Sequence, residues 1–128
     1  MPSDPRYLPV VRGAVGPLAA VVGWSEEECQ AVTLALDEAL TNIIRHAYHG
    51  RADGIIEVEC REDQGGLEFT LWDTGDPPDK SKICARRVGD QPGGMGTHII
   101  KDVMDTVSYQ ALPGGNRFVA VKRLQRTK

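Results

Sequence analysis

The sequence has little of what marks several large classes of protein. Its 128 residues carry a net charge of only −3 at pH 7, so it lacks the basic excess with which proteins bind nucleic acid directly. No apolar run approaches the roughly 18 residues that cross a bilayer, and the N-terminus shows no signal-peptide pattern. The three cysteines are widely spaced and form no Cys-x-x-Cys pair, which argues against a disulfide framework or a structural metal. With this length, the absences predict one cytoplasmic domain over residues 1–128 that does not bind membranes.

Glycine and proline, by contrast, are plentiful, with 14 and 8 residues, and they gather between Gly75 and Gly96. Glycine relaxes the backbone and proline fixes it, so a segment rich in both interrupts regular secondary structure. Inside a domain, such a segment is either a long loop or a place where the backbone surrounds a ligand. Composition alone leaves both interpretations open.

Helical periodicity is strongest in the first half of the chain. Residues 1–7 are expected to be frayed, and residues 8–22 predict a helix that Pro17 should kink. A helix over 25–48 is the clearest feature, because a serine and a glutamate three residues later form a capping box at its start. A shorter amphipathic helix is predicted at 97–104.

Strand patterns occupy the segments between and after these helices. Alternating residues at 55–61 and 67–72 predict an antiparallel hairpin, and 107–111 and 118–124 predict two further strands joined by a short turn. The order of elements therefore predicts an α+β domain built as a two-layer sandwich. A mostly antiparallel sheet of about four strands should be covered on one face by helices.

Three polar residues are spaced to share one face of the long predicted helix. Glu38, Asn42 and His46 follow one another at intervals of four, roughly opposite Leu36 and Leu40. A carboxylate at this place can accept a proton from an attacking hydroxyl, and an amide oxygen is a ligand for Mg²⁺ beside phosphate oxygens. Taken alone, the same spacing is more often that of a solvated polar face.

A second motif, Asp73-Thr74-Gly75, directly follows a predicted strand. A carboxylate there can accept hydrogen bonds from a planar donor such as an exocyclic amine. The glycine lets a flat ring lie close to the backbone. The simpler explanation of these three residues, considered in isolation, is a turn.

A third motif, Gly93-Gly94-Met95-Gly96, leads into the predicted helix that begins at Thr97. Glycines allow backbone N–H groups to converge on an anion, and the positive end of a helix dipole strengthens such a site. The segment matches neither the dinucleotide-binding fingerprint nor the P-loop. A flexible linker is the alternative interpretation of this motif alone.

In this order, the three motifs resemble those of the ATP-binding superfamily of type II topoisomerases, Hsp90-type chaperones, histidine kinases and MutL proteins. The chain looks most like the small bacterial anti-sigma factor serine/threonine kinases. Residues 34–48 are similar to their helix motif, 73–75 to their Asp-x-Gly box and 94–105 to their Gly-x-Gly helix. The resemblance covers about 8–124 and implies the Bergerat-type ATP-binding fold.

The resemblance also implies a role for individual side chains. Glu38 would be the general base that activates the hydroxyl of a serine or threonine substrate. Asn42 would coordinate the Mg²⁺ that bridges the ATP phosphates, with His46 on the same face of the cofactor site. Asp73 would bind the adenine amine, and Gly75 would form the floor of the adenine pocket.

The phosphate end of the implied site lies further along the chain. By resemblance, the phosphates would be contacted by Gly94, Met95, Gly96 and Thr97. Residues 76–93 would form the ATP lid. The sequence departs from the family in two places, since Pro92 and Gly93 stand where many relatives carry a basic residue, and Gly115-Asn116 stands where the family often has Gly-Thr. In the family, that threonine supports adenine binding.

The implied function is that of a protein serine/threonine kinase that uses ATP and Mg²⁺. It would bind a sigma factor or another regulator and phosphorylate a small antagonist protein. One alternative is a nucleotide-binding module without phosphotransfer, which the missing basic residue before Gly94 favours. Another is the catalytic module of a histidine kinase, although such modules have a longer lid and normally follow a helical domain.

The N-terminus bears on oligomeric state. Members of this family usually begin with an extra strand, through which some of them dimerise. Only seven residues precede Leu8. We therefore expect the N-terminal edge strand to be absent, which leaves a homodimer as an open alternative to a monomer.

Overall fold

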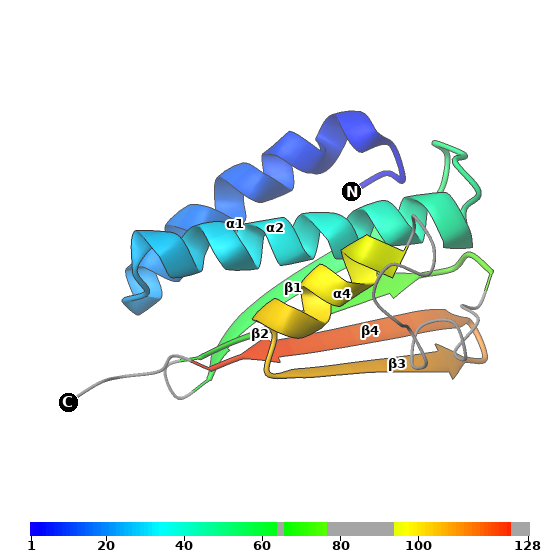
Figure 1. The fold of residues 1–128 in the computed structure, drawn as a ribbon. Coiled ribbons are helices and arrows are strands. Elements are labelled where there is room, and N and C mark those ends of the chain that lie inside the picture. The colour runs from blue at the N-terminus through cyan, green and yellow to red at the C-terminus, as the bar shows by residue number, and fades with distance from the viewer. Residues whose placement is uncertain (64–65, 77–93, 124–128) are drawn as a thin grey trace.

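Helices fill the first part of the chain and strands dominate the rest (Figure 1). The computed structural model describes residues 1–63, 66–76 and 94–123. In chain order, the elements are η1 (Pro5–Tyr7), α1 (Leu8–Val22), α2 (Glu26–Asn42), η2 (Ile43–Ala47), β1 (Ile56–Asp63), β2 (Gly66–Asp73), α4 (Gly94–Val103), β3 (Thr106–Leu112) and β4 (Gly115–Lys122). None of the helices in these ranges is long and apolar enough to cross a membrane.

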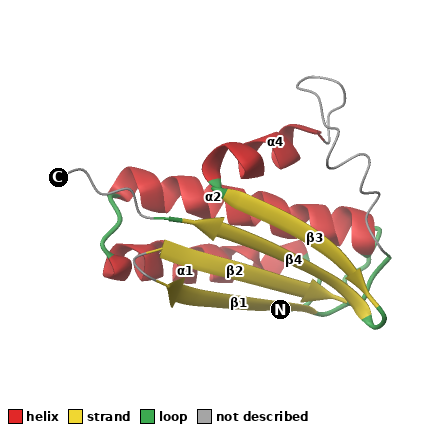
Figure 2. Cartoon of the chain, turned by 90° about the horizontal axis from the view of Figure 1, so that it is seen from below, coloured by secondary structure: helices red, strands yellow, loops and turns green. Residues whose placement is uncertain are grey.

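The four strands form one antiparallel sheet in the order β1-β2-β4-β3. All of the helices lie on the same face of this sheet, with α2 between α1 and α4 (Figures 1 and 2). The predicted α+β sandwich and the predicted hairpin of β1 and β2 are therefore confirmed. The order places β2 and β4 side by side in the middle of the sheet, although 41 residues separate the end of β2 from the start of β4 in sequence.

The long helix begins with the predicted capping box. The Glu28 amide donates to the Ser25 hydroxyl at 3.1 Å, and the Ser25 amide donates to the Glu28 carboxylate at 2.9 Å. The far end differs from the prediction of one α-helix to Tyr48. Its last turn, η2, is a π-helix, in which the Tyr48 amide donates to the Ile43 carbonyl five residues back, at 3.2 Å. Such turns are rare and often occur at functional sites.

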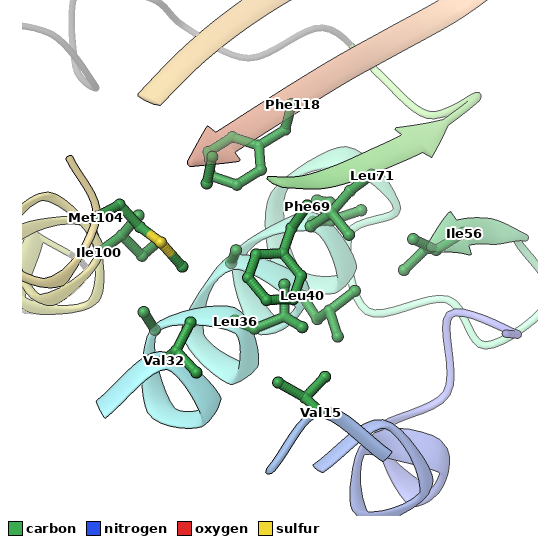
Figure 3. Close-up of a cluster of buried hydrophobic side chains, with 14 of the residues drawn as sticks. Val15, Val32, Leu36, Leu40, Ile56, Phe69, Leu71, Ile100, Met104 and Phe118 are labelled. Atoms are coloured by element: carbon green, nitrogen blue, oxygen red, sulfur yellow. The ribbon is translucent and has the colours of Figure 1, made fainter. Parts of the chain in front are cut away.

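The core lies between this helix and the sheet (Figure 3). Leu36 and Leu40 point from α2 toward Phe69 and Leu71 of β2, and all four are at most 1% exposed. Burial of each such side chain contributes about 1.5–3 kcal/mol. This packing holds the inner face of β2 against α2. It thereby determines where the residues at the end of β2 lie.

The first residues of the chain are ordered, and the expectation of a frayed start is wrong. The ammonium group of Met1 donates to the Ile56 carbonyl at 2.6 Å, and the Ile56 amide donates back to the Met1 carbonyl at 2.8 Å. Ser3 is fully buried. No N-terminal strand forms among the described residues, but an isolated bridge joins Pro2 to Ile55 at the edge of β1.

The helix α1 has the predicted bounds, Leu8–Val22, and stays helical across Pro17. The start of another helix differs from its prediction. The helix α4 begins at Gly94, three residues before the predicted start at Thr97. The prediction was late because the apolar periodicity on which it rested begins only at Ile99.

Candidate nucleotide-binding site

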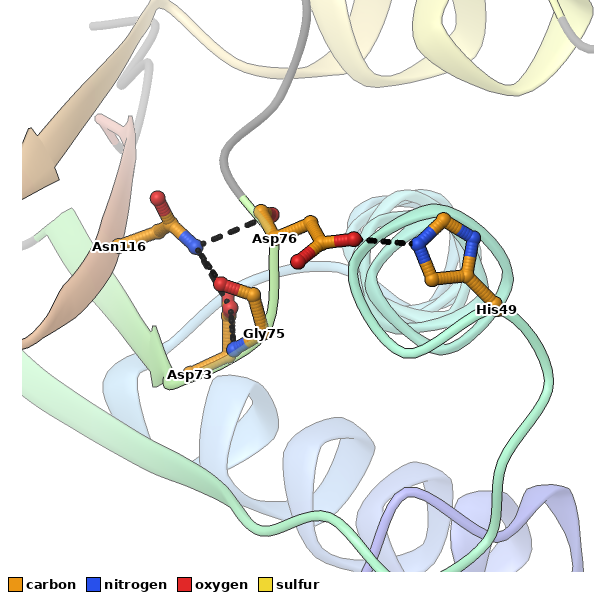
Figure 4. A network of polar contacts seen from close by, with 5 residues as sticks. All are labelled: His49, Asp73, Gly75, Asp76 and Asn116. Atoms are coloured by element: carbon orange, nitrogen blue, oxygen red, sulfur yellow. Dashed lines mark hydrogen bonds and ion pairs between the residues drawn. The ribbon is translucent and has the colours of Figure 1, made fainter.

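Asp73 ends β2 on the face of the sheet that the helices cover, where it is only 4% exposed. Its Oδ1 atom accepts two hydrogen bonds, one from the Gly75 amide at 3.0 Å and one from the Asn116 side chain at 2.8 Å (Figure 4). Asp73 and Asn116 are direct partners in the pairing of β2 with β4. Among the described residues, both bonds to this carboxylate end on Oδ1, so Oδ2 is the oxygen that a ligand could use.

Asn116 holds the loop after β2 in place. Besides Asp73, its Nδ2 atom donates to the carbonyls of Gly75 at 3.1 Å and Asp76 at 3.3 Å. All three partners are acceptors, so the side-chain nitrogen must face them. Asn116 is 3% exposed, which makes these bonds part of the interior of the domain.

Two glycines let the backbone approach closely at this point. A Cβ atom on Gly75 would lie 2.4 Å from the Ala47 carbonyl oxygen, and one on Gly115 would lie 2.2 Å from the Asp73 carbonyl oxygen. The Asp76 amide also donates to the Ala47 carbonyl at 2.9 Å. The loop after β2 is therefore packed between η2 and β4, and no larger residue than glycine fits at either contact.

This packing brings together two of the three predicted motifs. Asn42 is the last residue of α2, and the loop that contains Asp73 contacts the turn that follows it. Glu38 and Asn42 are both half-buried on α2. His46 lies in the π-helical turn and is exposed.

The third motif forms the start of α4. The four residues predicted to contact phosphates lie in its first turn, and the structure describes their backbone as helical: Gly94, Met95, Gly96 and Thr97. The amides of a first turn lack partners within the helix, and the helix dipole adds partial positive charge there. The helix α4 contacts α2 along the same face of the sheet. Most of the predicted lid, 77–93, lies outside the described residues.

Comparison with known proteins gives this arrangement a family. The sequence pattern of the histidine kinase-like ATPase domain matches residues 1–122. The chain is also 32% identical over 116 residues to the serine-protein kinase RsbW of Listeria innocua. The aligned segment covers 84% of this chain and 74% of that protein. The chain belongs to the histidine kinase-like ATPase domain family. The resemblance to the anti-sigma factor kinases of this superfamily is thereby confirmed.

Two further proteins are similar to this chain, one in sequence and one in fold. RsbW of Bacillus velezensis is 27% identical over 123 residues, which cover 89% of this chain and 77% of that protein. The histidine kinase domain of the blue-light activated kinase of Erythrobacter litoralis EL346 has a similar fold, with a TM-score of 0.62 at 17% identity. That similarity covers 97% of this chain but only 62% of the other, so the chain spans less than two thirds of its length.

The side-chain oxygen that Asn42 offers is compatible with binding of Mg²⁺ beside phosphates. Among residues 1–63, 66–76 and 94–123, no three or more His, Cys, Asp or Glu side chains gather as a metal site. Mg²⁺ in phosphate-binding sites typically takes one or two protein oxygens and completes its shell with phosphates and water. A single amide oxygen from Asn42 is consistent with that mode of binding.

Burial raises the pKa of two side chains on the sheet. Burial raises the pKa of Tyr109 to about 12, and the charge of Asp73 adds to the effect. The Tyr109 ring packs against Phe118 with centroids 5.2 Å apart. Burial also raises the pKa of Cys60 to about 11, so its thiol is protonated near neutral pH and is a poor nucleophile.

Reasoning from sequence missed two parts of the site. Tyr48, within a motif that was recognised, bonds through its hydroxyl to both Ile55 and Thr74. His49 has a left-handed backbone, with φ of 54°, and its Nε2 lies 2.6 Å from the Asp76 carboxylate (Figure 4). Both side chains of this last pair are exposed, so it contributes little to stability. In the sequence, Tyr48 could have been noticed as a lone aromatic residue at the end of a predicted helix.

Proposed function

We propose that this chain is an ATP-dependent protein serine/threonine kinase of the anti-sigma factor type. The observation that carries the proposal is the buried Asp73, whose Oδ1 is held by Asn116 and Gly75 while none of the described residues bonds to Oδ2. A carboxylate held in this way accepts a hydrogen bond from the exocyclic amine of adenine. The relatives named serine-protein kinase RsbW support the choice of acceptor.

The chemistry follows from two positions on α2. Glu38 accepts the proton of a serine or threonine hydroxyl on the protein substrate. The hydroxyl oxygen then attacks the γ-phosphorus of ATP, the bond to the β,γ-bridging oxygen breaks, and ADP leaves with that electron pair. Bound Mg²⁺, with Asn42 as its protein ligand, would offset the charge of the phosphates. Such a transfer requires mainly positioning and charge stabilisation, so few side chains are needed.

The phosphates of ATP would lie at the first turn of α4. There the backbone amides of Gly94 to Thr97 and the helix dipole would bind them. His46 would lie at the edge of this cofactor site, and residues 76–93 would cover it as the lid. The base would rest against Gly75. A side chain at this position would collide with the Ala47 carbonyl and displace the backbone.

Protein partners complete the proposal. We place the chain in the cytoplasm, where it would bind a sigma factor or another regulator and phosphorylate a small antagonist protein. A homodimer, as in some anti-sigma factor kinases, stays an open alternative to a monomer. The net charge of −3 favours these partners over nucleic acid.

A phosphotransfer assay tests this function. The chain is incubated with Mg²⁺-ATP and a candidate antagonist from its gene neighbourhood, and acid-stable phosphate is measured on serine or threonine. Glu38→Gln should abolish transfer but keep ATP binding, because the amide cannot accept the proton. Glu27→Gln, an exposed change in the first turn of the same helix, is the matched control and should leave transfer intact.

The assay also separates the alternatives. Tight ATP binding without transfer to any partner would support a nucleotide-binding module. The presence of Pro92 and Gly93, where many relatives carry a basic residue, favours that alternative. Acid-labile phosphate on the substrate would support a histidine kinase module instead. Transfer that survives Glu38→Gln would refute the assignment of the base.

A further inference from the structure

The end of the long helix, the start of β1 and the loop after β2 meet at one phenol oxygen. We propose that Tyr48 is a positioning residue, which sets the adenine-binding carboxylate relative to α2, the helix that carries Glu38 and Asn42. The inference rests on the proposed binding of ATP. It adds a residue that neither contacts the reacting atoms nor belongs to the predicted site.

The hydroxyl of Tyr48 is fully engaged by backbone groups from two strands. It donates to the Ile55 carbonyl at 2.6 Å and accepts from the Thr74 amide at 2.8 Å. The Thr74 hydroxyl lies 3.3 Å away. A phenol offers one proton and accepts at its oxygen, so these contacts use its hydrogen-bonding capacity in both directions.

The ring of Tyr48 is immobilised as well. The residue is 4% exposed, and its ring lies against the backbone of Gly54, where a Cβ atom would be only 2.4 Å from the ring carbon Cε1. At its backbone, the Tyr48 amide bonds to Ile43 in the π-helical turn, and the Arg51 amide donates to its carbonyl at 2.9 Å. The hydroxyl therefore has a fixed place from which to hold the loop.

The position of Thr74 explains why this bond matters for a ligand. Thr74 lies between Asp73, which would bind the base, and Gly75, against which the base would pack. Asn116 holds this loop from the side of β4, whereas Tyr48 and the Ala47 carbonyl hold it from the side of the helix. Removal of the hydroxyl leaves the amide of Thr74 without that partner and lets the loop move away from the helix.

ATP would span both parts of the site, with its base at Asp73 and its phosphates near Asn42 and α4. A shift of the loop therefore weakens the bond to the base more than the contacts to the phosphates. Inosine triphosphate has an oxo group in place of the 6-amino group, so it cannot donate to the Asp73 carboxylate from that position. The preference for ATP over inosine triphosphate reports the placement of this carboxylate directly.

The test uses Tyr48→Phe in the full chain, with Tyr7→Phe as the control. Tyr7 is 41% exposed on η1 and loses no hydrogen bond recorded in the structure. Calorimetry measures Kd for ATP, inosine triphosphate and tripolyphosphate. Tyr48→Phe should weaken ATP binding about tenfold, the factor that corresponds to one buried hydrogen bond, and shrink the ATP preference by a similar factor. Binding of the other two ligands should change less than twofold.

A second measurement keeps the test informative if the variant is less stable. Amide hydrogen exchange at Thr74 should become at least about tenfold faster in folded Tyr48→Phe, because its acceptor is gone. Equal weakening for ATP and inosine triphosphate, or unchanged ATP affinity, would overturn the role of Tyr48. Failure of the unmodified chain to bind ATP would instead overturn the proposed function, and with it the inference.

Discussion

Asn116→Leu is the substitution that most directly tests what holds Asp73 and the loop after β2 in place. Leucine has the same branched arrangement of side-chain heavy atoms, so the change removes the amide without opening a cavity. It deletes the bond to the Asp73 carboxylate at 2.8 Å and the weaker bonds to the carbonyls of Gly75 and Asp76 at 3.1 and 3.3 Å. The nitrogen has two protons for these three acceptors, so the two carbonyls share one of them.

The expected magnitude follows from these bonds. A hydrogen bond to a charged group contributes about 1.5–3 kcal/mol and a neutral one about 0.5–1.5 kcal/mol. The free energy of unfolding should therefore fall by about 2–4 kcal/mol. A domain of 128 residues has about 6–19 kcal/mol to lose, so the variant should remain folded. Its affinity for ATP should fall at least about tenfold as Asp73 loses its orientation.

Urea unfolding followed by circular dichroism measures the first quantity, with an unchanged m-value as the criterion that only stability has changed. Asn116→Thr keeps one donor and should recover part of the loss. Gln110→Leu is the matched control, because this carboxamide lies exposed on β3 and Arg117 is its one side-chain partner among the described residues. Its effect should stay within about 0.5 kcal/mol.

A double-mutant cycle with Asp73→Ala, which removes the accepting oxygen, isolates the bond between the two side chains. The coupling free energy should be about 1–2 kcal/mol, since the pair is in direct contact. A loss below about 0.5 kcal/mol for Asn116→Leu, together with unchanged ATP affinity, would refute the idea that this amide holds the site. Additive effects of the two substitutions would refute the pairing itself.

Three further outcomes can be checked with purified protein. Gly75→Ala should cost more than about 2 kcal/mol by urea unfolding, because its Cβ would meet the backbone oxygen of Ala47, whereas Gly114→Ala meets nothing within 4 Å and should be nearly neutral. Burial raises the pKa of Tyr109 to about 12. The contribution of this tyrosine to the free energy of unfolding is therefore fully present below about pH 10 and is lost as the pH rises through about 12. That loss should reach about 3 kcal/mol and be absent in Tyr109→Phe. Cys60, with a pKa of about 11, should react with iodoacetamide at pH 8 about a hundredfold more slowly than a peptide thiol, as peptide mapping would show.

Signals that act between near neighbours were readable in the sequence. The capping box of Ser25 and Glu28 is complete within four residues, and the structure contains both of its bonds. The alternation that predicted β1 and β2 places successive side chains on opposite faces, a property of each strand by itself. In β2, however, every residue is buried or half-buried. The π-helical turn at Ile43–Ala47 was not predicted, because nothing in the local pattern distinguishes it from a continued α-helix.

Contacts between distant segments could not be read in the same way. The tie between Met1 and Ile56 joins residues 55 positions apart, so the first residues looked unstructured although they are held. Gly75 was interpreted as space for a flat ring, and the structure adds a packing reason, its approach to the Ala47 carbonyl. Both are consequences of where the helix lies on the sheet.

By itself, the sequence determined the elements, their order and the three motifs, because helix caps, periodicity and glycine spacing are local properties of the chain. The tertiary structure decided which groups meet. Pairing of β2 with β4 set Asn116 opposite Asp73, 43 residues away, and packing of the helix end onto the loop set Tyr48 against Thr74. Hydrogen bonds of this kind depend on register and on burial, which exist only once the sheet and the helices have come together.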